Sequence, residues 1–201
     1  MKLVRPMSEP RGLPALEAAL EEEFRLLGPP VEPWVPAYSG AMHDVLIVGG
    51  GQSGITIAHA LRRAGVERVS VVESEPQHRA GSWQSKGRMQ NLRTSKFNRG
   101  PDLEIPSLTF RAWHEARYGC GAYDRIEPAS TRDWIDYLEW LRSRTNVSVR
   151  YDTKLIAVEP SQGLIRARLQ VRSGKSPVET CRKLILATGM AGCGQPNLPD
   201  A

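Results

Sequence analysis

The 201-residue sequence contains few cysteines, and their spacing is uninformative. Only Cys120, Cys181 and Cys193 are present, no two of them have CxxC spacing, and no histidine and cysteine residues cluster at metal-ligand spacing. An odd number of unpatterned cysteines argues against a disulfide framework, and the same absence predicts no metal site. We therefore expect reduced, structural thiols.

Long apolar stretches are also missing. No run of 18 apolar residues occurs, which argues against a transmembrane helix. Lys2 and Arg5 are not followed by the apolar segment of a signal peptide. From these two absences we expect no membrane partner and a cytoplasmic location.

Basic residues are in excess, but they are not arranged as a nucleic-acid interface. The net charge is +5, yet the lysines and arginines are dispersed and do not alternate with aromatic residues, which make up 6% of the chain. Nucleic-acid binding is therefore not predicted. A positive excess suits a site that receives a pyrophosphate.

Two regions follow from the pattern of apolar residues. Residues 13–27 have helical periodicity, and a proline-rich linker covers residues 28–36. The main folded domain is expected to begin at Asp44. We therefore predict an N-terminal helix and linker over residues 1–43 and one domain over residues 44–201.

The start of that domain has the pattern of a βαβ unit. Residues 45–48 form a short aliphatic run, residues 52–64 are amphipathic with helical spacing, and residues 69–72 form a second aliphatic run. Gly65 is placed to end the helix. Strand, glycine turn, helix and strand in this order predict parallel pairing.

The remainder adds helices and then strands. Helices are expected at residues 107–118 and 131–144, with Ser130 or Thr131 as the N-cap of the second. Strands are expected near residues 147–151, 154–159, 164–171 and 178–187. The predicted fold class is α/β: a Rossmann-like domain with a central parallel sheet, a small antiparallel β-meander and a helical insertion.

The turn after the first strand matches G-x-G-x-x-G through Gly49, Gly51 and Gly54. Gly49 allows the tight turn, Gly51 lets a pyrophosphate approach the backbone, and Gly54 lets helix and strand pack closely. Glu73 ends the second strand, 19 residues after Gly54, where a carboxylate can accept hydrogen bonds from a ribose. The neighbours Gln52, Ser53 and Ser74 are predicted to belong to the same dinucleotide site.

Three segments resemble the flavin-containing monooxygenases and their bacterial relatives, among the flavoproteins with two dinucleotide-binding domains. Gly81-Ser-Trp83 is similar to a G-G-x-W segment of that family, with Ala80 in place of its first glycine. Ala187-Thr-Gly189 and Pro196-Asn-Leu-Pro199 are similar to the segment that crosses between its domains. The resemblance covers residues 44–201, and it implies FAD, not NAD, as the dinucleotide.

The resemblance also implies further contacts with FAD. Leu155 would meet the adenine through its backbone, Ser82 and Trp83 would lie on the flavin side, and Thr188 and Gly189 would lie at the end of the crossing strand. Two alternatives stay open at this point. Trp83 could be a core aromatic residue, and Thr188 with Gly189 could be an ordinary turn.

No second glycine motif occurs between Gly54 and Ala201, so NAD(P)H is expected only in a complete enzyme. The chain is interpreted as the FAD-binding portion of a flavin-dependent oxidoreductase, in its complete form an NAD(P)H-dependent monooxygenase. Alternatives are a non-catalytic dinucleotide-binding or interaction module and a disulfide-reductase-type flavoprotein. No catalytic side chain can be named, the substrate stays open, and the chain is expected to act as a homo-oligomer or with a complementing subunit.

Overall fold

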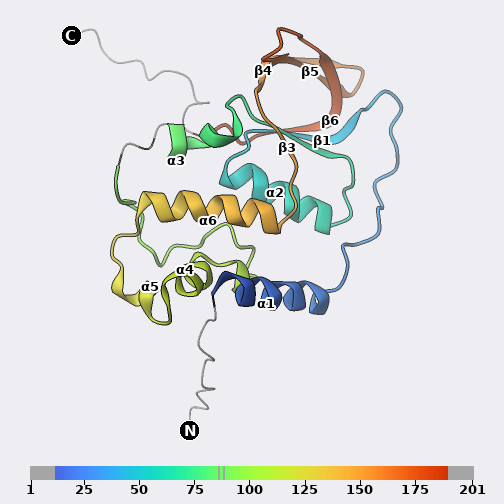
Figure 1. The fold of residues 1–201 in the computed structure, drawn as a ribbon. Helices are drawn as coiled ribbons and strands as arrows, with labels where there is room; N and C mark the ends of the chain where they lie inside the picture. Colours follow the sequence, from blue (N-terminus) through green and yellow to red (C-terminus); the bar gives the residue numbers. More distant parts are fainter. Residues whose placement is uncertain (1–11, 86, 88, 190–201) are drawn as a thin grey trace, which may run out of the picture. The chain divides into compact units, whose positions relative to one another are not determined.

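The computed structural model describes residues 12–85, 87 and 89–189, which fall into two compact units. The sheet unit takes its described residues from 30–88 and 145–201, and the helical unit from 1–29 and 89–144 (Figure 1). No helix in the described part of the chain is long and apolar enough to cross a membrane.

Six strands of the described residues form one sheet in the order β3-β2-β1-β6-β5-β4. Their bounds are His43–Val48 (β1), Val69–Val72 (β2), Val149–Arg150 (β3), Thr153–Ser161 (β4), Leu164–Val171 (β5) and Val178–Leu186 (β6). β1 pairs in parallel with β2 and β6, and β2 pairs in parallel with β3. The predicted parallel core is therefore confirmed.

Strands β4, β5 and β6 form the predicted antiparallel meander, which curls on itself in Figure 1. Gln162 and Gly163 connect β4 to β5 and both have positive φ angles, as the two central residues of a type I′ hairpin require. β6 changes partner along its length. Its first residues pair with β5, and from Cys181 onward it pairs with β1, so the meander continues directly into the parallel sheet.

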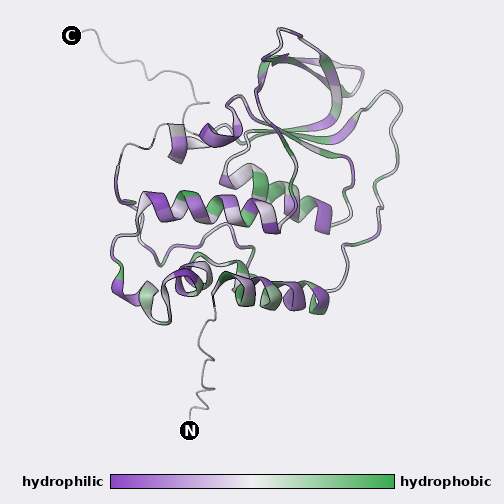
Figure 2. Cartoon of the chain, viewed as in Figure 1, coloured by the Kyte–Doolittle hydropathy of each residue, from purple (hydrophilic) through white to green (hydrophobic). Residues whose placement is uncertain are grey.

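The parallel strands are buried on both faces, and this explains their unbroken aliphatic sequences. One face packs Val45, Ile47 and Val71 against Ile55 and Ala58 of helix α2 (Gln52–Arg63). On the other face, Leu46, Val48 and Val72 pack against Ala167, Leu169 and Cys181 of the meander. Hydropathy in Figure 2 follows this pattern, with hydrophobic residues concentrated in the strands of the sheet.

The C-terminal end of α2 is fully capped. The amide of Gly65 donates to Arg62 O and that of Val66 donates to Leu61 O, which is a Schellman motif with Gly65 at a φ of +81°. The linker adds two donors from outside the helix. Val31 N donates to Arg63 O over 2.9 Å, and Trp34 Nε1 donates to Ala64 O over 2.8 Å.

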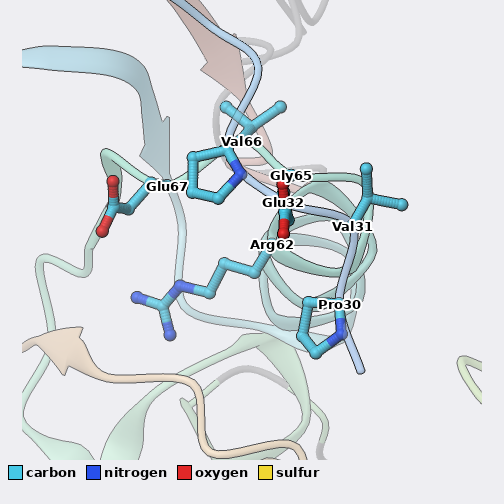
Figure 3. A pocket seen from close by; sticks show the side chains of 8 residues that line it. Pro30, Val31, Glu32, Arg62, Gly65, Val66 and Glu67 are labelled. Atoms are coloured by element: carbon cyan, nitrogen blue, oxygen red, sulfur yellow. The ribbon is translucent and has the colours of Figure 1, made fainter. Parts of the chain in front are cut away.

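Gly65 is also necessary because the linker passes so close to it. A Cβ atom at this position would lie 2.7 Å from Glu32 O and 2.9 Å from Trp34 Cδ1. Beside this crossing lies a hollow of about 490 Å³ (Figure 3), lined by residues 30–33, Arg62 and residues 65–67. We call it the linker hollow.

The helical unit contains four α-helices and a short 3₁₀-helix among its described residues. They are α1 (Leu13–Leu26), η2 (Pro106–Leu108), α4 (Phe110–Tyr118), α5 (Ala122–Arg125) and α6 (Thr131–Arg144). Two more short helices, η1 (Gln77–Arg79) and α3 (Ser82–Ser85), belong to the sheet unit. The predicted helices at 13–27, 52–64 and 131–144 are thus confirmed to within a residue.

The predicted helix at 107–118 is interrupted, and a cap explains why. Thr109 has an extended backbone, and its side chain accepts a hydrogen bond from Ala112 N, so α4 begins only after it. At α6 the choice between two caps is settled. Ser130 Oγ accepts hydrogen bonds from the amides of Arg132 and Asp133, which is the role of an N-cap.

Helix α1 is fixed within the helical unit by its acidic residues. Glu23 accepts hydrogen bonds from the amide and hydroxyl of Ser107, and Glu17 accepts one from Trp140 Nε1. The core of this unit is aromatic, with Trp113 and Tyr137 fully buried and the Tyr137 hydroxyl donating to Leu108 O.

Candidate functional site

The turn after β1 brings the glycine motif against the end of β6. Gly49 has a φ of +115°, and a Cβ atom there would lie only 2.2 Å from Ala187 O. Ala187 N in turn donates to Val48 O over 2.8 Å. Two segments separated by more than a hundred residues therefore meet at Gly49, which needs glycine for both its conformation and its contact.

Gly54 allows α2 to pack directly against this turn. A Cβ atom at Gly54 would lie 1.9 Å from Gly49 O and 3.5 Å from Ile47 Cγ2. Any side chain would push the helix away from β1. The packing role predicted for the third glycine is what the geometry shows.

Gly51 differs from Gly49 and Gly54 because a Cβ atom there would meet no other atom at a clashing distance. The nearest atom to a Cβ built there is Gly81 Cα at 3.7 Å, an ordinary van der Waals distance. Gly81 lies opposite with a φ of +79°. A Cβ atom at Gly51 is therefore compatible with the fold, and the packing of the chain does not by itself require glycine at this position.

The first turn of α2 faces the same space with its backbone donors. Gly51 is the N-cap and provides no side-chain cap, and no acidic residue lies in the first turn. The first helical bond runs from Ile55 N to Gly51 O. The preceding amides, at Gln52, Ser53 and Gly54, point along the helix axis with the positive end of its dipole, which is an arrangement suited to phosphate.

Glu73 is buried, and its carboxylate is held by local donors. Oε2 accepts a hydrogen bond from Gly50 N over 2.9 Å, and Oε1 accepts one from Glu75 N over 3.0 Å and one from the Ser74 hydroxyl over 3.1 Å. A carboxylate can accept about four hydrogen bonds, so acceptor capacity is left for a ribose. The orientation of the group is fixed in advance.

Gly50 is a site residue that sequence reasoning missed. A Cβ atom there would lie 2.8 Å from Val149 Cγ1 and 3.0 Å from Glu73 Cβ. Gly50 therefore brings its own amide to the Glu73 carboxylate while β3 packs above it. The only available signal was that Gly50 is the middle one of three consecutive glycines, since the motif allows any residue at this position.

The segment around α3 completes this side of the site. Trp83 Nε1 donates to Gln52 Oε1 over 3.3 Å, which ties the segment to the first residue of α2. A Cβ atom at Gly189 would lie 3.1 Å from Ser82 Oγ. Three motifs that are distant in sequence therefore converge at the carboxyl ends of the parallel strands.

The other predicted residues lie at the edges of this arrangement. Ser53 and Ser74 are exposed, and Thr188 and Gly189 are exposed directly after β6. Leu155 lies in β4 beside a β-bulge, two residues after Thr153, whose amide donates to Glu73 O. Pro196 to Pro199 lie outside the described residues. The assignment of all these residues to a cofactor stays a prediction.

Neither metal nor disulfide chemistry has a centre in the described residues. They contain no group of three or more His, Cys, Asp or Glu side chains suited to a metal ion. Cys181 is buried in the sheet unit, where burial raises the pKa of its thiol, and Cys120 is exposed in the helical unit. Cys193 lies outside the described residues.

The comparison with protein families decides the relationship. Residues 46–200 match the family described as pyridine nucleotide-disulphide oxidoreductase. The chain belongs to this family. The predicted relationship to flavin-dependent oxidoreductases is thereby confirmed, and the glycine turn, Glu73 and the end of β6 all lie within the matched residues.

A curated protein is similar to this chain over most of the chain's length. The chain is 41% identical over 193 residues to a FAD-dependent urate hydroxylase of Xanthomonas campestris pv. campestris, covering 94% of this chain and 40% of that protein. The chain thus spans about two fifths of that relative's length.

Among solved structures, the reduced form of an ornithine hydroxylase from Pseudomonas aeruginosa is 25% identical, with a TM-score of 0.58, and the match covers 78% of this chain and 40% of that one. A bacillithiol disulfide reductase from Bacillus cereus is 17% identical, with a TM-score of 0.55 over 72% of this chain and 39% of the other. The second likeness shows the fold alone.

Proposed function

We propose that this chain is the FAD-binding portion of a flavin-dependent oxidoreductase and that the complete protein is an NAD(P)H-dependent monooxygenase. The observation that carries this proposal is the convergence of the uncapped start of α2, Gly81 and the buried, locally oriented Glu73 carboxylate at the carboxyl ends of the parallel strands. Gly49 and Gly54 are explained by the contacts of the fold itself. A Cβ atom at Gly51 would make only an ordinary van der Waals contact with Gly81, so this proposal explains the glycine by the close approach of a pyrophosphate to the backbone.

The residues fit the adenosine diphosphate half of FAD in distinct roles. The amides that begin α2 would hold the pyrophosphate, and Glu73 would accept hydrogen bonds from the ribose. Because Glu73 is already oriented by Gly50 and Glu75, binding would require little rearrangement there. Its negative charge would also repel a 2′-phosphate, which favours FAD over NADP at this half-site.

The flavin side of the site would be shaped by Ser82, Trp83 and the end of β6. Trp83 is held by Gln52, so its ring would be in position before the cofactor arrives. When bound, FAD supplies the redox chemistry, and the protein supplies binding, orientation and exclusion of water. Leu155, Thr188 and Gly189 are assigned to the same cofactor by the resemblance.

The names of two relatives support hydroxylation in the complete protein. The Xanthomonas protein is named a FAD-dependent urate hydroxylase, and the Pseudomonas structure is that of an ornithine hydroxylase. We propose the same reaction type for the complete protein, with NAD(P)H bound by residues outside this chain. A disulfide-reductase mechanism is less well supported, because Cys181 is buried and its thiol pKa is raised.

Within this proposal, residues 44–201 form the FAD-binding domain and residues 1–43 precede it. The free thiols of Cys120 and Cys181 support a cytoplasmic location, where cysteines stay reduced. A purely non-catalytic dinucleotide-binding module would share the same half-site. Only activity of the complete protein separates these two functions.

FAD titration of the 201-residue chain tests the binding step. We expect saturable binding at one site per chain. Binding is monitored through flavin absorbance and through the quenching of tryptophan fluorescence. FMN is the matched control, because it lacks the adenosine monophosphate part, including the ribose assigned to Glu73, and should bind far more weakly. Absence of binding at saturating FAD, or equal affinity for FMN, would contradict the proposal. For the complete FAD-loaded protein, NADPH oxidation coupled to oxygen uptake tests the reaction class.

A further inference from the structure

The linker hollow lies at the opposite end of α2 from the cofactor site. The first turn of α2 follows the carboxyl end of β1, whereas its last turn leads through Gly65 to the beginning of β2. A helix of 12 residues is about 18 Å long. Flavoprotein cofactors in such sheets bind at the carboxyl ends of the strands, so completion of the cofactor site does not require this surface.

Two large apolar side chains are exposed beside the hollow on a backbone that is held in place. Val31 is 58% exposed and Trp34 is 67% exposed. Each is nevertheless fixed by a hydrogen bond to the end of α2, to Arg63 O and Ala64 O respectively. Exposed apolar groups that are already ordered lose little entropy when a partner covers them, which is a property of protein interfaces.

The linker precedes the residues that match the family. The family match begins at residue 46, after the linker. The alignment with the Xanthomonas relative covers 94% of the chain and therefore includes the linker. We take a segment that precedes the family match, and that carries ordered apolar residues at its surface, as the surface for a contact beyond the cofactor site.

The charges around the hollow suit a second copy of the same surface. Arg62 lines it together with Glu32 and Glu67, and Figure 3 shows the side chains of Arg62 and Glu67 extending to the same side. Within the described part of the chain, Arg62 donates to the backbone oxygens of Asn146 and Val69 and to no carboxylate. Across a two-fold axis, Arg62 of each copy can meet Glu67 of the other.

We propose that the linker hollow is the contact surface between two copies of this chain in a two-fold symmetric dimer. The apolar centre of the interface is formed by Val31 and Trp34, and the ion pairs between Arg62 and Glu67 lie around it. This inference does not depend on FAD binding, and each can fail without the other.

Sedimentation velocity and light scattering on the purified 201-residue chain test the dimer directly. We expect a species of twice the 22.3 kDa chain mass, with a dissociation constant at or below about 10 μM, as for a standard-size interface. A monomer at about tenfold higher protein concentration overturns the proposal, because the surface would then be free or covered by other parts of the complete protein.

Val31→Asp places a charge in the proposed apolar centre and should weaken the dimer at least about tenfold, since burying an unpaired charge is costly. Phe97→Asp is the matched control, because Phe97 is 77% exposed and belongs to the helical unit, and it should leave the dimer unchanged. Undiminished association of Val31→Asp, or equal weakening by the control, refutes the assignment of the surface.

A charge exchange provides a second test that is independent of Val31. Glu67→Arg should weaken the dimer, because it places two positive charges opposite each other, one at position 67 and one at Arg62 of the other copy. The paired variant Glu67→Arg with Arg62→Glu should restore the dimer. Thermal unfolding of each variant shows whether the chain is folded. Failure of the exchange to recover association in a folded chain argues against the two-fold pairing.

Discussion

The two ends of helix α2 are treated in opposite ways by the same sheet unit. At the C-terminal end, the Schellman bonds, Val31 N and Trp34 Nε1 together satisfy the last carbonyl groups. At the N-terminal end there is no side-chain cap and no acidic residue in the first turn. The N-cap is Gly51, where the fold would tolerate a Cβ atom. Four donors outside the helical hydrogen-bond pattern satisfy carbonyl groups at the C-terminal end, whereas no side chain caps the amides at the N-terminal end.

The difference therefore indicates which groups are kept for a ligand. Backbone donors that remain open are costly unless water or a bound molecule satisfies them. The same contrast appears between two buried carboxylates. Each accepts three hydrogen bonds, but those of Glu179 come from the charged or ionisable side chains of Arg150 and His43, whereas those of Glu73 come from two backbone amides and the Ser74 hydroxyl. Substitutions at the two ends of α2 and at the two carboxylates test whether ligand binding and stability depend on different residues.

Gly54→Ala should have the largest effect, and it should act on the fold. Its Cβ atom would lie 1.9 Å from Gly49 O, so helix and strand must move apart. We expect the free energy of unfolding to fall by about 3–5 kcal/mol, measured by urea denaturation. Ser53→Ala, at the exposed neighbouring position, should change it by less than about 0.5 kcal/mol. Similar losses of unfolding free energy in the two variants would contradict the packing role of Gly54.

Gly51→Val should separate binding from folding. The nearest atom to a Cβ at this position is Gly81 Cα at 3.7 Å, so the chain should fold. The valine side chain would occupy the path of the pyrophosphate. We expect FAD affinity to fall by at least about 100-fold, measured by titration, with a near-native unfolding curve. A chain that binds FAD with unaltered affinity would show that the pyrophosphate does not approach Gly51.

Glu73→Ala should weaken FAD binding by about 1–3 kcal/mol, the usual loss for a charged hydrogen-bond partner. It should also lower stability, because the amides of Gly50 and Glu75 lose their acceptor. Glu75→Ala is the control, since that side chain only pairs with Arg79 at 3.7 Å. An equal loss of affinity in the control would assign the effect to general surface charge.

Glu179→Gln should lower stability by about 2 kcal/mol without changing FAD affinity. Arg150 and then His43 hold the pKa of Glu179 below its usual 4.5. The carboxylate therefore contributes stability that is fully present above pH 4.5 and is lost as the pH falls through the lowered pKa. Thermal unfolding from pH 7 to pH 3 should show the wild-type advantage shrinking with acidification. A constant difference would rule out this linkage.

Trp34→Phe should have the smallest effect. It removes the donor to Ala64 O and keeps most of the ring, so we expect a loss of about 1 kcal/mol in unfolding free energy and unchanged FAD affinity. Trp83→Phe is its counterpart at the open end, where the lost bond is to Gln52. There FAD affinity should change more than stability. The reverse pattern would mean that the two ends of α2 do not differ in function.

Much of the fold was predictable because its signals are local. The aliphatic runs of β1 and β2, the periodicity of α2 and the glycine at position 65 each depend on a few neighbouring residues. The change of partner along β6 was not predictable, since one continuous run carries no mark of it at Cys181. Likewise, residues 107–118 are periodic throughout, and only the hydroxyl of Thr109 shows where the α-helix begins.

The site was predictable where a motif assigns a role to each residue. Gly49 and Gly54 have the contacts that the pattern implies. Gly50 was missed because its importance depends on Val149 and Glu73, which reach it only through the pairing of β3 with β2. The hydrogen bond between Trp83 and Gln52 joins residues that are 31 positions apart. The periodicity of the sequence does not predict such a contact.

The open start of α2 makes the amount of folded protein depend on the supply of its ligand. A molecule that binds only the folded chain stabilises it by about 2.7 kcal/mol when present at 100 times its dissociation constant. If FAD satisfies the first turn of α2, cells short of riboflavin would hold less of this protein even at constant synthesis. The unsatisfied amides of one helix turn would then couple vitamin status to protein abundance.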